Sequence, residues 1–231
     1  MLLIDLWQDL LHLFYPHLCP ACAATLPTKA HVICPQCISQ LPRTFDENAV
    51  ENPTEKMFVG RIRIIKAWSA FYFHKGGVMQ LLIHELKYKN AQSLGYFLGE
   101  LMGMQMLETK QKLKIDALLP LPMHKKKERK RGYNQALLIA QGISNVTGIP
   151  VIAHAVIKTK STSTQTNKHR IARWQNASGN FEVAEPEQLQ NKHLLLVDDV
   201  ITTGATLEAC GSLITQLPGT RLSIATLARA A

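Results

Sequence analysis

Four cysteines near the amino terminus have the spacing of a metal site. They form two CxxC pairs, Cys19 with Cys22 and Cys34 with Cys37, separated by eleven residues. Two thiolates three positions apart on a tight turn chelate one ion, and two such turns complete a tetrahedral shell suited to Zn²⁺. Because four protein ligands leave no open position on the ion, we predict a structural zinc ion that folds the module.

The compartment bears on what these cysteines do. Asp5 and Asp9 interrupt the apolar run of the first fifteen residues, which has no positively charged start. We therefore expect an amphipathic helix that docks onto protein, not a signal peptide. No segment reaches the roughly 18 apolar residues of a membrane span. In the cytoplasmic protein that this predicts, a disulfide framework is disfavoured, and a redox site would need only one CxxC pair. The fifth cysteine, Cys210, lies in an apolar helical pattern and is expected in the core.

A second chemical motif follows an apolar run at 194–197, which is typical of a strand buried on both faces. Two adjacent carboxylates, Asp198 and Asp199, come next, and a loop rich in threonine then opens a helical pattern. The loop residues are Thr202, Thr203, Gly204, Ala205 and Thr206. Backbone N–H groups at a helix start, together with these hydroxyls, form a nest for a phosphate monoester.

The two carboxylates need a different partner, because like charges repel a phosphate. Asp198 and Asp199 can accept hydrogen bonds from two vicinal hydroxyls, directly or through Mg²⁺. A phosphate beside a vicinal diol indicates a ribose 5-phosphate. The chain has no GxxxxGK[ST] pattern, so this is not a Walker A loop.

The positive charge of the chain is concentrated in one region. With 26 Lys and Arg against 17 Asp and Glu, the formal net charge is +9. Residues 124–176 alone carry eleven basic residues and a single acid, Glu128, so the rest of the chain is nearly neutral. Such a region fits an anion site for phosphate or a nucleic acid backbone, although a solvated, solubilising face has the same composition.

Strands that alternate with helices must position these groups. We expect strands within 61–73 and at 115–121, 151–157, 193–198 and 221–228. Helices are expected at about 78–89, 91–107, 134–146 and 205–217. This alternation predicts an α/β fold with a parallel sheet flanked by helices, where ligands lie beyond the carboxyl ends of the strands. Residues 44–57 are polar and acidic and are expected to be a linker or loop. We divide the chain into an N-terminal helix, zinc module and linker at 1–57 and an α/β domain at 58–231.

The stretch LLLVDDVITTGAT resembles the 5-phosphoribosyl-1-pyrophosphate (PRPP) signature of type I phosphoribosyltransferases. Together with the two CPxC pairs, His84-Glu-Leu-Lys87-Tyr88, Arg131-Gly-Tyr-Asn-Gln135 and Arg173-x-x-Asn176, it resembles the ComF family of competence proteins. Related GntX-type and amidophosphoribosyltransferase-like proteins share the pattern. The resemblance covers nearly the whole chain and implies a type I phosphoribosyltransferase-like fold with a small N-terminal zinc-binding module.

The resemblance also implies roles for the basic region. The loop at 124–131 would contact pyrophosphate, and the polar segment 158–176 would form a mobile hood over the site. Cations and Mg²⁺ there would stabilise a leaving pyrophosphate. The candidate ligands for pyrophosphate or DNA are Lys87, Lys125, Arg131, Lys168, Arg170 and Arg173.

Several of these side chains have structural alternatives. Lys87 can pair with a nearby acid instead of a ligand. Tyr133 and Trp174 can stack on a base, but core packing is the more common role of a large aromatic residue. Asn134 and Gln135 are expected to open the following helix rather than to touch substrate.

Two functions follow from the resemblance. A ComF-like protein would bind PRPP and Mg²⁺ and handle imported single-stranded DNA during natural transformation, with competence helicase and recombination proteins as partners. Alternatively, a phosphoribosyltransferase, which is a pentosyltransferase, would move ribose 5-phosphate from PRPP to an unidentified acceptor. A PRPP-sensing regulator is a weaker third hypothesis. No general base and no acceptor pocket stand out in the sequence, which therefore leaves open whether the protein is an enzyme.

Overall fold

The computed structural model describes residues 17–26, 32–109, 113–159 and 180–230. The helix expected within the first fifteen residues lies outside these ranges, as does most of the segment expected to form a hood. None of the helices within them is both long enough and apolar enough to cross a bilayer.

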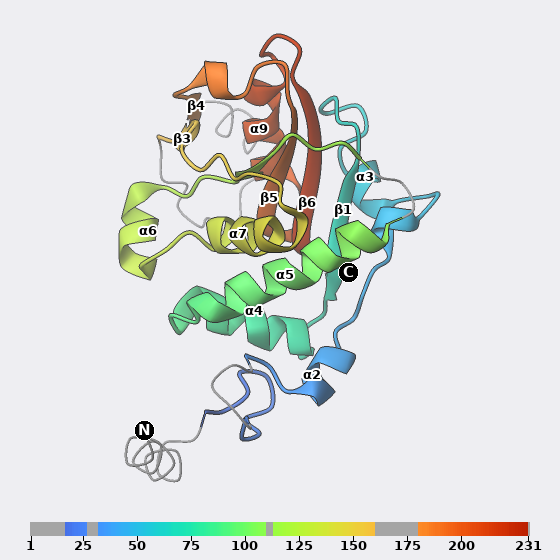
Figure 1. The fold of residues 1–231 in the computed structure, drawn as a ribbon, viewed down its shortest axis with the longest axis vertical. Coiled ribbons are helices and arrows are strands. Elements are labelled where there is room, and N and C mark those ends of the chain that lie inside the picture. Colours follow the sequence, from blue (N-terminus) through green and yellow to red (C-terminus); the bar gives the residue numbers. More distant parts are fainter. Residues whose placement is uncertain (1–16, 27–31, 110–112, 160–179, 231) are drawn as a thin grey trace.

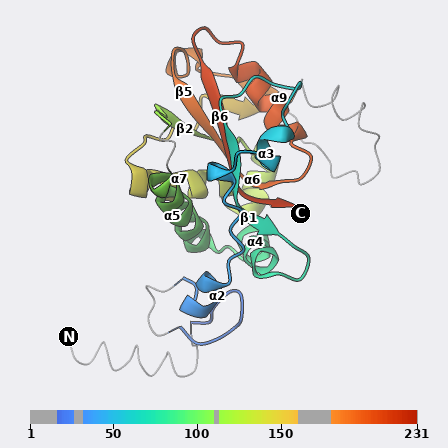
Figure 2. The ribbon, with the colours of Figure 1, turned by 90° about the vertical axis from the view of Figure 1, so that its right-hand side faces the viewer.

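A parallel sheet of four strands in the order β1-β6-β5-β2 forms the centre of the protein (Figures 1 and 2). The strands are β1 (Ala67–Phe73), β2 (Ala117–Pro120), β5 (His193–Ile201) and β6 (Arg221–Ala230). On β5, Leu194 and Leu196 belong to the core on one face of the sheet, whereas Leu195 and Val197 belong to the core on the other. A strand covered on both faces requires this alternation. The predicted parallel sheet is confirmed.

Helices cover both faces of the sheet. Figure 2 shows α5 (Gln92–Glu108) and α7 (Gln135–Thr147) on one side and α9 (Ala205–Ile214) on the other; α4 (Val78–Tyr88) packs on the side of α5. α5 and α7 cross in backbone contact, since a Cβ atom added at Gly142 would lie 2.0 Å from the carbonyl oxygen of Tyr96. The α/β architecture with helices on both faces is the one expected from the sequence.

The basic segment after β2 is a helix, not the expected loop. α6 (Lys125–Arg131) consists of six basic residues and Glu128. Lys, Arg and Glu all favour helix. The His124 ring accepts a hydrogen bond from the backbone N–H of Lys126, and Gly132 ends the helix in the left-handed region with φ of 87°. The sequence therefore contained the start, body and end of a short helix.

The strand expected at 151–157 is much shorter than predicted. Val151 forms one isolated parallel bridge with Leu118 of β2. The chain then leaves the sheet, and β3 (Val156–Lys158) pairs antiparallel with β4 (Phe181–Val183) in a separate two-stranded sheet. A short 3-10 turn, η2 (Pro186–Gln188), follows β4. The apolar pattern therefore indicated a partly buried segment but not the strand with which it pairs.

Residues 44–57, expected to be a linker or loop, are packed against β1. They contain the 3-10 helix η1 (Asp46–Asn48) and the helix α3 (Pro53–Lys56). The buried Asn52 side chain caps α3 and donates a hydrogen bond to the carbonyl oxygen of Ala67 at 2.5 Å, and Thr54 is fully buried. The polar composition of this segment predicted exposure to solvent, but the side chains of Asn52 and Thr54 are buried and form hydrogen bonds within the protein. The division into domains at residue 57 stays a prediction.

Candidate functional site

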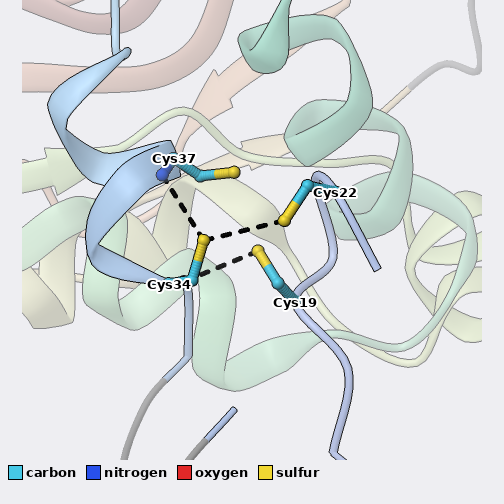
Figure 3. A group of neighbouring side chains, drawn as sticks. All are labelled: Cys19, Cys22, Cys34 and Cys37. Atoms are coloured by element: carbon cyan, nitrogen blue, oxygen red, sulfur yellow. Dashed lines mark hydrogen bonds between the residues drawn. The ribbon is translucent and has the colours of Figure 1, made fainter. Parts of the chain in front are cut away.

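The four cysteines of the two CxxC pairs meet in one cluster (Figure 3). Their Sγ atoms all lie within 4.8 Å of one another, and those of Cys22 and Cys34 are 3.6 Å apart. Sulfurs arranged tetrahedrally about 2.3 Å from a zinc ion are roughly 3.8 Å apart, whereas a disulfide bond is about 2.05 Å long. The cluster can therefore hold a metal ion such as zinc.

Tight backbone turns bring the sulfurs together. The N–H of Ala23 donates to the carbonyl oxygen of Cys19, and Cys34 caps the helix α2 (Pro35–Ser39). Burial opposes ionisation of the Cys19 thiol, but hydrogen bonds led by that from the backbone N–H of Cys34 lower its pKa to about 6. Burial raises the pKa of Cys37. Hydrogen bonds to sulfur favour the thiolate that metal binding needs.

The two adjacent carboxylates lie within β5, near its carboxyl end, because pairing with β6 continues as far as Ile201. The backbone N–H of Asp199 donates to Oδ1 of Asp198 at 2.8 Å. Asp199 Oδ2 lies 2.8 Å from Nζ of Lys87, which projects from α4. Lys87 therefore pairs with a nearby acid, which was the alternative to a role in ligand binding. The acid is Asp199, so the ion pair is part of the candidate site.

Asp198 is partly buried and lies beside a second carboxylate. Burial, and then the negative charge of Asp199, raise the pKa of Asp198 to about 8. Positive charge on Lys87 and Lys158 acts in the opposite direction without cancelling the effect. Of the two carboxyl groups, Asp198 is therefore the one whose surroundings favour the protonated form.

The threonine-rich loop joins β5 to α9. Thr202, Thr203 and Thr206 are exposed, as a phosphate nest requires. Gly204 caps α9 with φ of +72°, and a Cβ atom there would lie 3.2 Å from the ring of Phe58. Both the left-handed backbone and the close approach of Phe58 favour glycine at this position.

Arg61 contacts this loop through hydrogen bonds, and the sequence did not predict that it belongs to the site. Its Nη1 donates to the carbonyl oxygens of Thr203 at 2.9 Å and Met57 at 2.7 Å, and its Nη2 pairs with the buried carboxylate of Glu208 on α9. The contact with Thr203 spans 142 positions in the chain, and no local motif marks it.

A cleft of about 180 Å³ lies in front of the carboxylate pair. Its lining includes Lys87, Leu121, Pro122, Met123, His124, Lys127, Arg131, Asn134, Gln135, Ala136, Lys158, Asp198 and Asp199. The fold thus brings four of the predicted site residues to one place: Lys87, Arg131, Asp198 and Asp199. Residues 202–206 are not among the lining residues and lie at the adjoining end of β5.

Of the other basic candidates, the structure describes only Lys125. Lys125 is exposed on α6 and is not among the residues that line the cleft. Lys168, Arg170 and Arg173 lie outside the described residues. Lys127 and Lys158 line the cleft; both belong to the two basic segments predicted to lie at the site, but neither was an individual candidate.

Lys158 ends β3, and its Nζ lies 5.0 Å from the centre of the Phe181 ring. Burial, and then the charge of Lys127, lower the pKa of Lys158. Its place in the cleft depends on the antiparallel pairing of β3 with β4.

Of the three residues 133–135, two have structural roles and one is a candidate ligand-binding residue. Tyr133 is buried and its hydroxyl donates to the carbonyl oxygen of Leu86 at 2.6 Å, so it is a core residue. Asn134 caps α7, as expected. Gln135 is different: its side chain is buried against the cleft, Arg131 donates to its Oε1 at 2.7 Å, and its Nε2 has no hydrogen-bond partner in the described structure. Trp174 lies outside the described residues.

Comparison with known proteins places the chain in a family. It is 32% identical over 156 residues to competence protein F of Haemophilus influenzae, a match that covers 66% of this chain and 68% of that protein. The chain belongs to the ComF family. The same family resemblance extends to the DNA utilization protein YhgH of Escherichia coli O157:H7, at 26% identity over 85% of this chain and 77% of that protein. No protein-family model matches the chain.

Among solved structures, this ComF-family protein is similar to a glutamine PRPP amidotransferase from B. subtilis complexed with ADP and GMP. The sequence identity is 16%, the TM-score is 0.44, and the match covers 63% of this chain and 30% of that chain. The type I phosphoribosyltransferase-like fold expected from the sequence rests on family membership and on the parallel sheet, and the cysteine cluster is the predicted metal-binding module.

Proposed function

We propose that this ComF-family protein binds PRPP with Mg²⁺ at the carboxyl end of β5. One arrangement carries the proposal: two adjacent carboxylates lie near the carboxyl end of the central strand β5, and the exposed threonine loop that leads into α9 follows that strand. An acidic pair suits a vicinal diol, and the loop suits a phosphate. Both groups occur side by side in a ribose 5-phosphate.

Different groups of the cleft would contact different parts of PRPP. Asp198 and Asp199 would accept the ribose hydroxyls or contact Mg²⁺, for which carboxylate oxygens are suitable ligands. A diol or a cation there would relieve the repulsion that raises the pKa of Asp198. Lys127, Arg131 and Lys158 would face the pyrophosphate. The unpartnered Nε2 of Gln135 would donate to a ligand oxygen.

Ligand-dependent stability tests PRPP binding. A ligand at one hundred times its dissociation constant stabilises the native state by about 2.7 kcal/mol. PRPP with Mg²⁺ is therefore expected to raise the melting temperature, and the double substitution Asp198→Asn with Asp199→Asn is expected to abolish the rise. Glu187→Gln, an exposed acid in η2, is the matched control and should keep it. An unchanged melting curve of the unmodified protein at millimolar PRPP would contradict the proposal.

We further propose that the protein handles single-stranded DNA in the cytoplasm during natural transformation, alongside competence helicase and recombination proteins. Two relatives carry the names competence protein F and DNA utilization protein. The observation on this chain is α6, whose Lys125, Lys126, Lys127, Arg129 and Lys130 are all exposed beside the cleft. Such a helix suits a phosphate backbone.

Salt dependence tests the DNA proposal. Neutralised phosphates release counterions, so affinity for a single-stranded oligonucleotide is expected to fall steeply between 50 and 200 mM salt, by roughly 0.7 logarithmic units per contact for each tenfold rise. Lys125→Gln with Lys126→Gln should reduce the slope. Binding with a flat salt dependence would remove the electrostatic basis. Displacement of the oligonucleotide by PRPP would show that the two ligands share the cleft, whereas simultaneous binding would separate them.

Phosphoribosyl transfer to an unidentified acceptor is the second candidate function. The cations that line the cleft favour it, because they lie where a leaving pyrophosphate would accumulate charge. Release of pyrophosphate from PRPP in the presence of candidate nitrogen nucleophiles tests the transfer. Stabilisation by PRPP without any turnover would leave binding as the function.

A further inference from the structure

A second pocket lies at the other end of the sheet, beside the amino ends of the strands. Its volume is about 200 Å³, and it is separate from the carboxylate cleft, with which it shares no lining residue. Most of its lining is apolar: Trp68, Met106, Leu107, Leu113, Ile115 and Ile149. The polar side chains in the lining are Glu47, Lys66, Thr109 and Thr147. A mostly apolar pocket with a few polar groups is the usual form of a small-molecule site.

Glu47 is the unusual member of this lining. The residue is only 4% exposed, and its Oε2 has no hydrogen-bond partner within the described structure. Its Oε1 lies 3.8 Å from Nη2 of Arg43, which is long for a hydrogen bond. Buried acceptors are rarely left without a donor, because leaving one unpaired costs about 1–3 kcal/mol and more for a charged group. Within the described residues, Oε2 of Glu47 is therefore an acceptor without a donor, and the neighbouring Nε of Arg43, which also lacks a partner there, does not reach it.

The nearby hydroxyl groups cannot supply that donor in their present arrangement. Thr109 donates its hydroxyl hydrogen to the carbonyl oxygen of Gln105 at 3.0 Å, and Thr147 donates to that of Ile143 at 2.8 Å. Lys66 lies 3.8 Å from the carboxylate of Glu55. Each threonine hydroxyl has one hydrogen to give and has given it within its own helix.

We propose that this pocket binds a small planar aromatic molecule that carries an N–H donor. The N–H group would donate to Oε2 of Glu47, and the aromatic body would pack on Trp68, Met106 and Leu113. The volume is below the 300–1,000 Å³ typical of drug-sized ligands, so the pocket fits a compact one- or two-ring molecule. This site is independent of the phosphoribosyl cleft, and the two proposals can fail separately.

Two probes of the same shape test the proposal on the full-length protein. Indole carries an N–H group, and benzofuran has an oxygen atom in its place. With ¹⁵N-labelled protein, indole is expected to shift the amide signals of Trp68, Leu113 and Ile149. It should also bind at least about tenfold more tightly than benzofuran, as for one hydrogen bond to a carboxylate. Equal affinity of the two probes, or no binding of indole at millimolar concentration, would overturn it.

Benzamidine, which is planar and positively charged, distinguishes the kind of N–H donor. Tighter binding of benzamidine than of indole would assign a cationic ligand, and the reverse would assign a neutral one. In either case Glu47→Gln is expected to weaken benzamidine binding about tenfold. Glu108→Gln is the matched control, because Glu108 also contacts Arg43 but is exposed and outside the pocket. It should leave binding unchanged.

A second variant keeps the proposal testable if Glu47→Gln fails to fold. Met106→Trp is designed to fill the pocket while leaving Glu47 in place, and it should remove binding of both indole and benzamidine. Probe binding that survives in Met106→Trp, or that is the same in Glu47→Gln as in the unmodified protein, would contradict the assignment. Stabilisation by PRPP should persist in both variants, since neither residue lines the cleft.

Discussion

The cysteine cluster and the charged cleft are assembled over very different distances in the chain. The cluster uses two turns within residues 19–37, and each pair of ligands is local. The cleft combines residues from α4, α6, the start of α7, β3 and β5, which extend from position 87 to 199. One site is therefore held by short turns and the other by the packing of the whole α/β domain.

This difference separates the forces that hold each site in place. A local cluster needs little loop closure, and a metal ion bound there would stabilise it directly. The cleft is not held by local turns of this kind, and its shape depends on how the helices pack on the sheet. α7, which begins at Gln135 beside the cleft, is held against α5 by the close backbone contact at Gly142. Two substitutions far from each other can thus test the two sites separately.

The largest effect is expected from losing a cysteine ligand. Cys37→Ser removes one of four ligands, and metal binding in small zinc modules is worth about 10–16 kcal/mol in apparent free energy. We expect loss of bound zinc, measured by metal analysis, and loss of the amide signals of residues 32–39. The matched control is Cys210→Ala, because Cys210 is buried on α9 and lies outside the cluster. Retention of one zinc ion per chain in Cys37→Ser would contradict the assignment.

A smaller effect is expected at the helix crossing. In Gly142→Ala the new methyl group would meet the backbone of Tyr96 at 2.0 Å, and such overpacking costs typically about 1–3 kcal/mol. We expect a lower free energy of unfolding in urea and weaker PRPP binding, with zinc content unchanged. Gln141→Ala changes the exposed neighbour and should behave like the unmodified protein. If zinc were lost together with stability, the two sites would not be separable in this way.

The same contrast explains how much of the fold the sequence predicted. α4, α5, β2 and β5 lie close to their expected ranges because each has a long apolar pattern or clear end signals. Pairing of 156–158 with β4 depends on a strand 23 or more positions further on, which no local pattern marks. The buried polar contacts of Asn52 likewise need a partner strand that composition does not reveal.

Prediction of the sites followed the same rule. The sequence contained the cysteine cluster completely, and it contained the carboxylate pair with its threonine loop. It did not reveal Lys127 and Lys158 in the cleft, because their position depends on how α6 and β3 sit against β5. It also gave no sign of Arg61, whose bond to Thr203 joins segments far apart in the chain. Residues that act through tertiary packing carry no signature of their own.

The smallest expected effect concerns protonation of the cleft. Burial and Asp199 raise the pKa of Asp198 from an ordinary 3.8 to about 8, so between these values the native state binds more protons than the unfolded chain. Stability from this group is present at low pH and is lost as pH rises through about 8. The dependence should be well below the roughly 1.4 kcal/mol per pH unit of a fully shifted group, because Asp198 is partly exposed.

Asp198→Asn removes this titration and keeps the shape of the side chain. In urea unfolding, the free energy of unfolding of the variant minus that of the unmodified protein is expected to increase from pH 5.5 to pH 8.5. Glu187→Gln, which changes an exposed acid in η2 outside the cleft lining, should show no such gain. Conversely, the ionised form of Asp198 is the one that can accept a diol or contact Mg²⁺, so PRPP affinity in the unmodified protein should rise over the same interval. If the difference in free energy of unfolding between Asp198→Asn and the unmodified protein did not depend on pH, Asp198 would not hold a proton in this interval. Repulsion between the two carboxylates would then play no part in ligand binding, and the shape of the cleft would depend on packing alone.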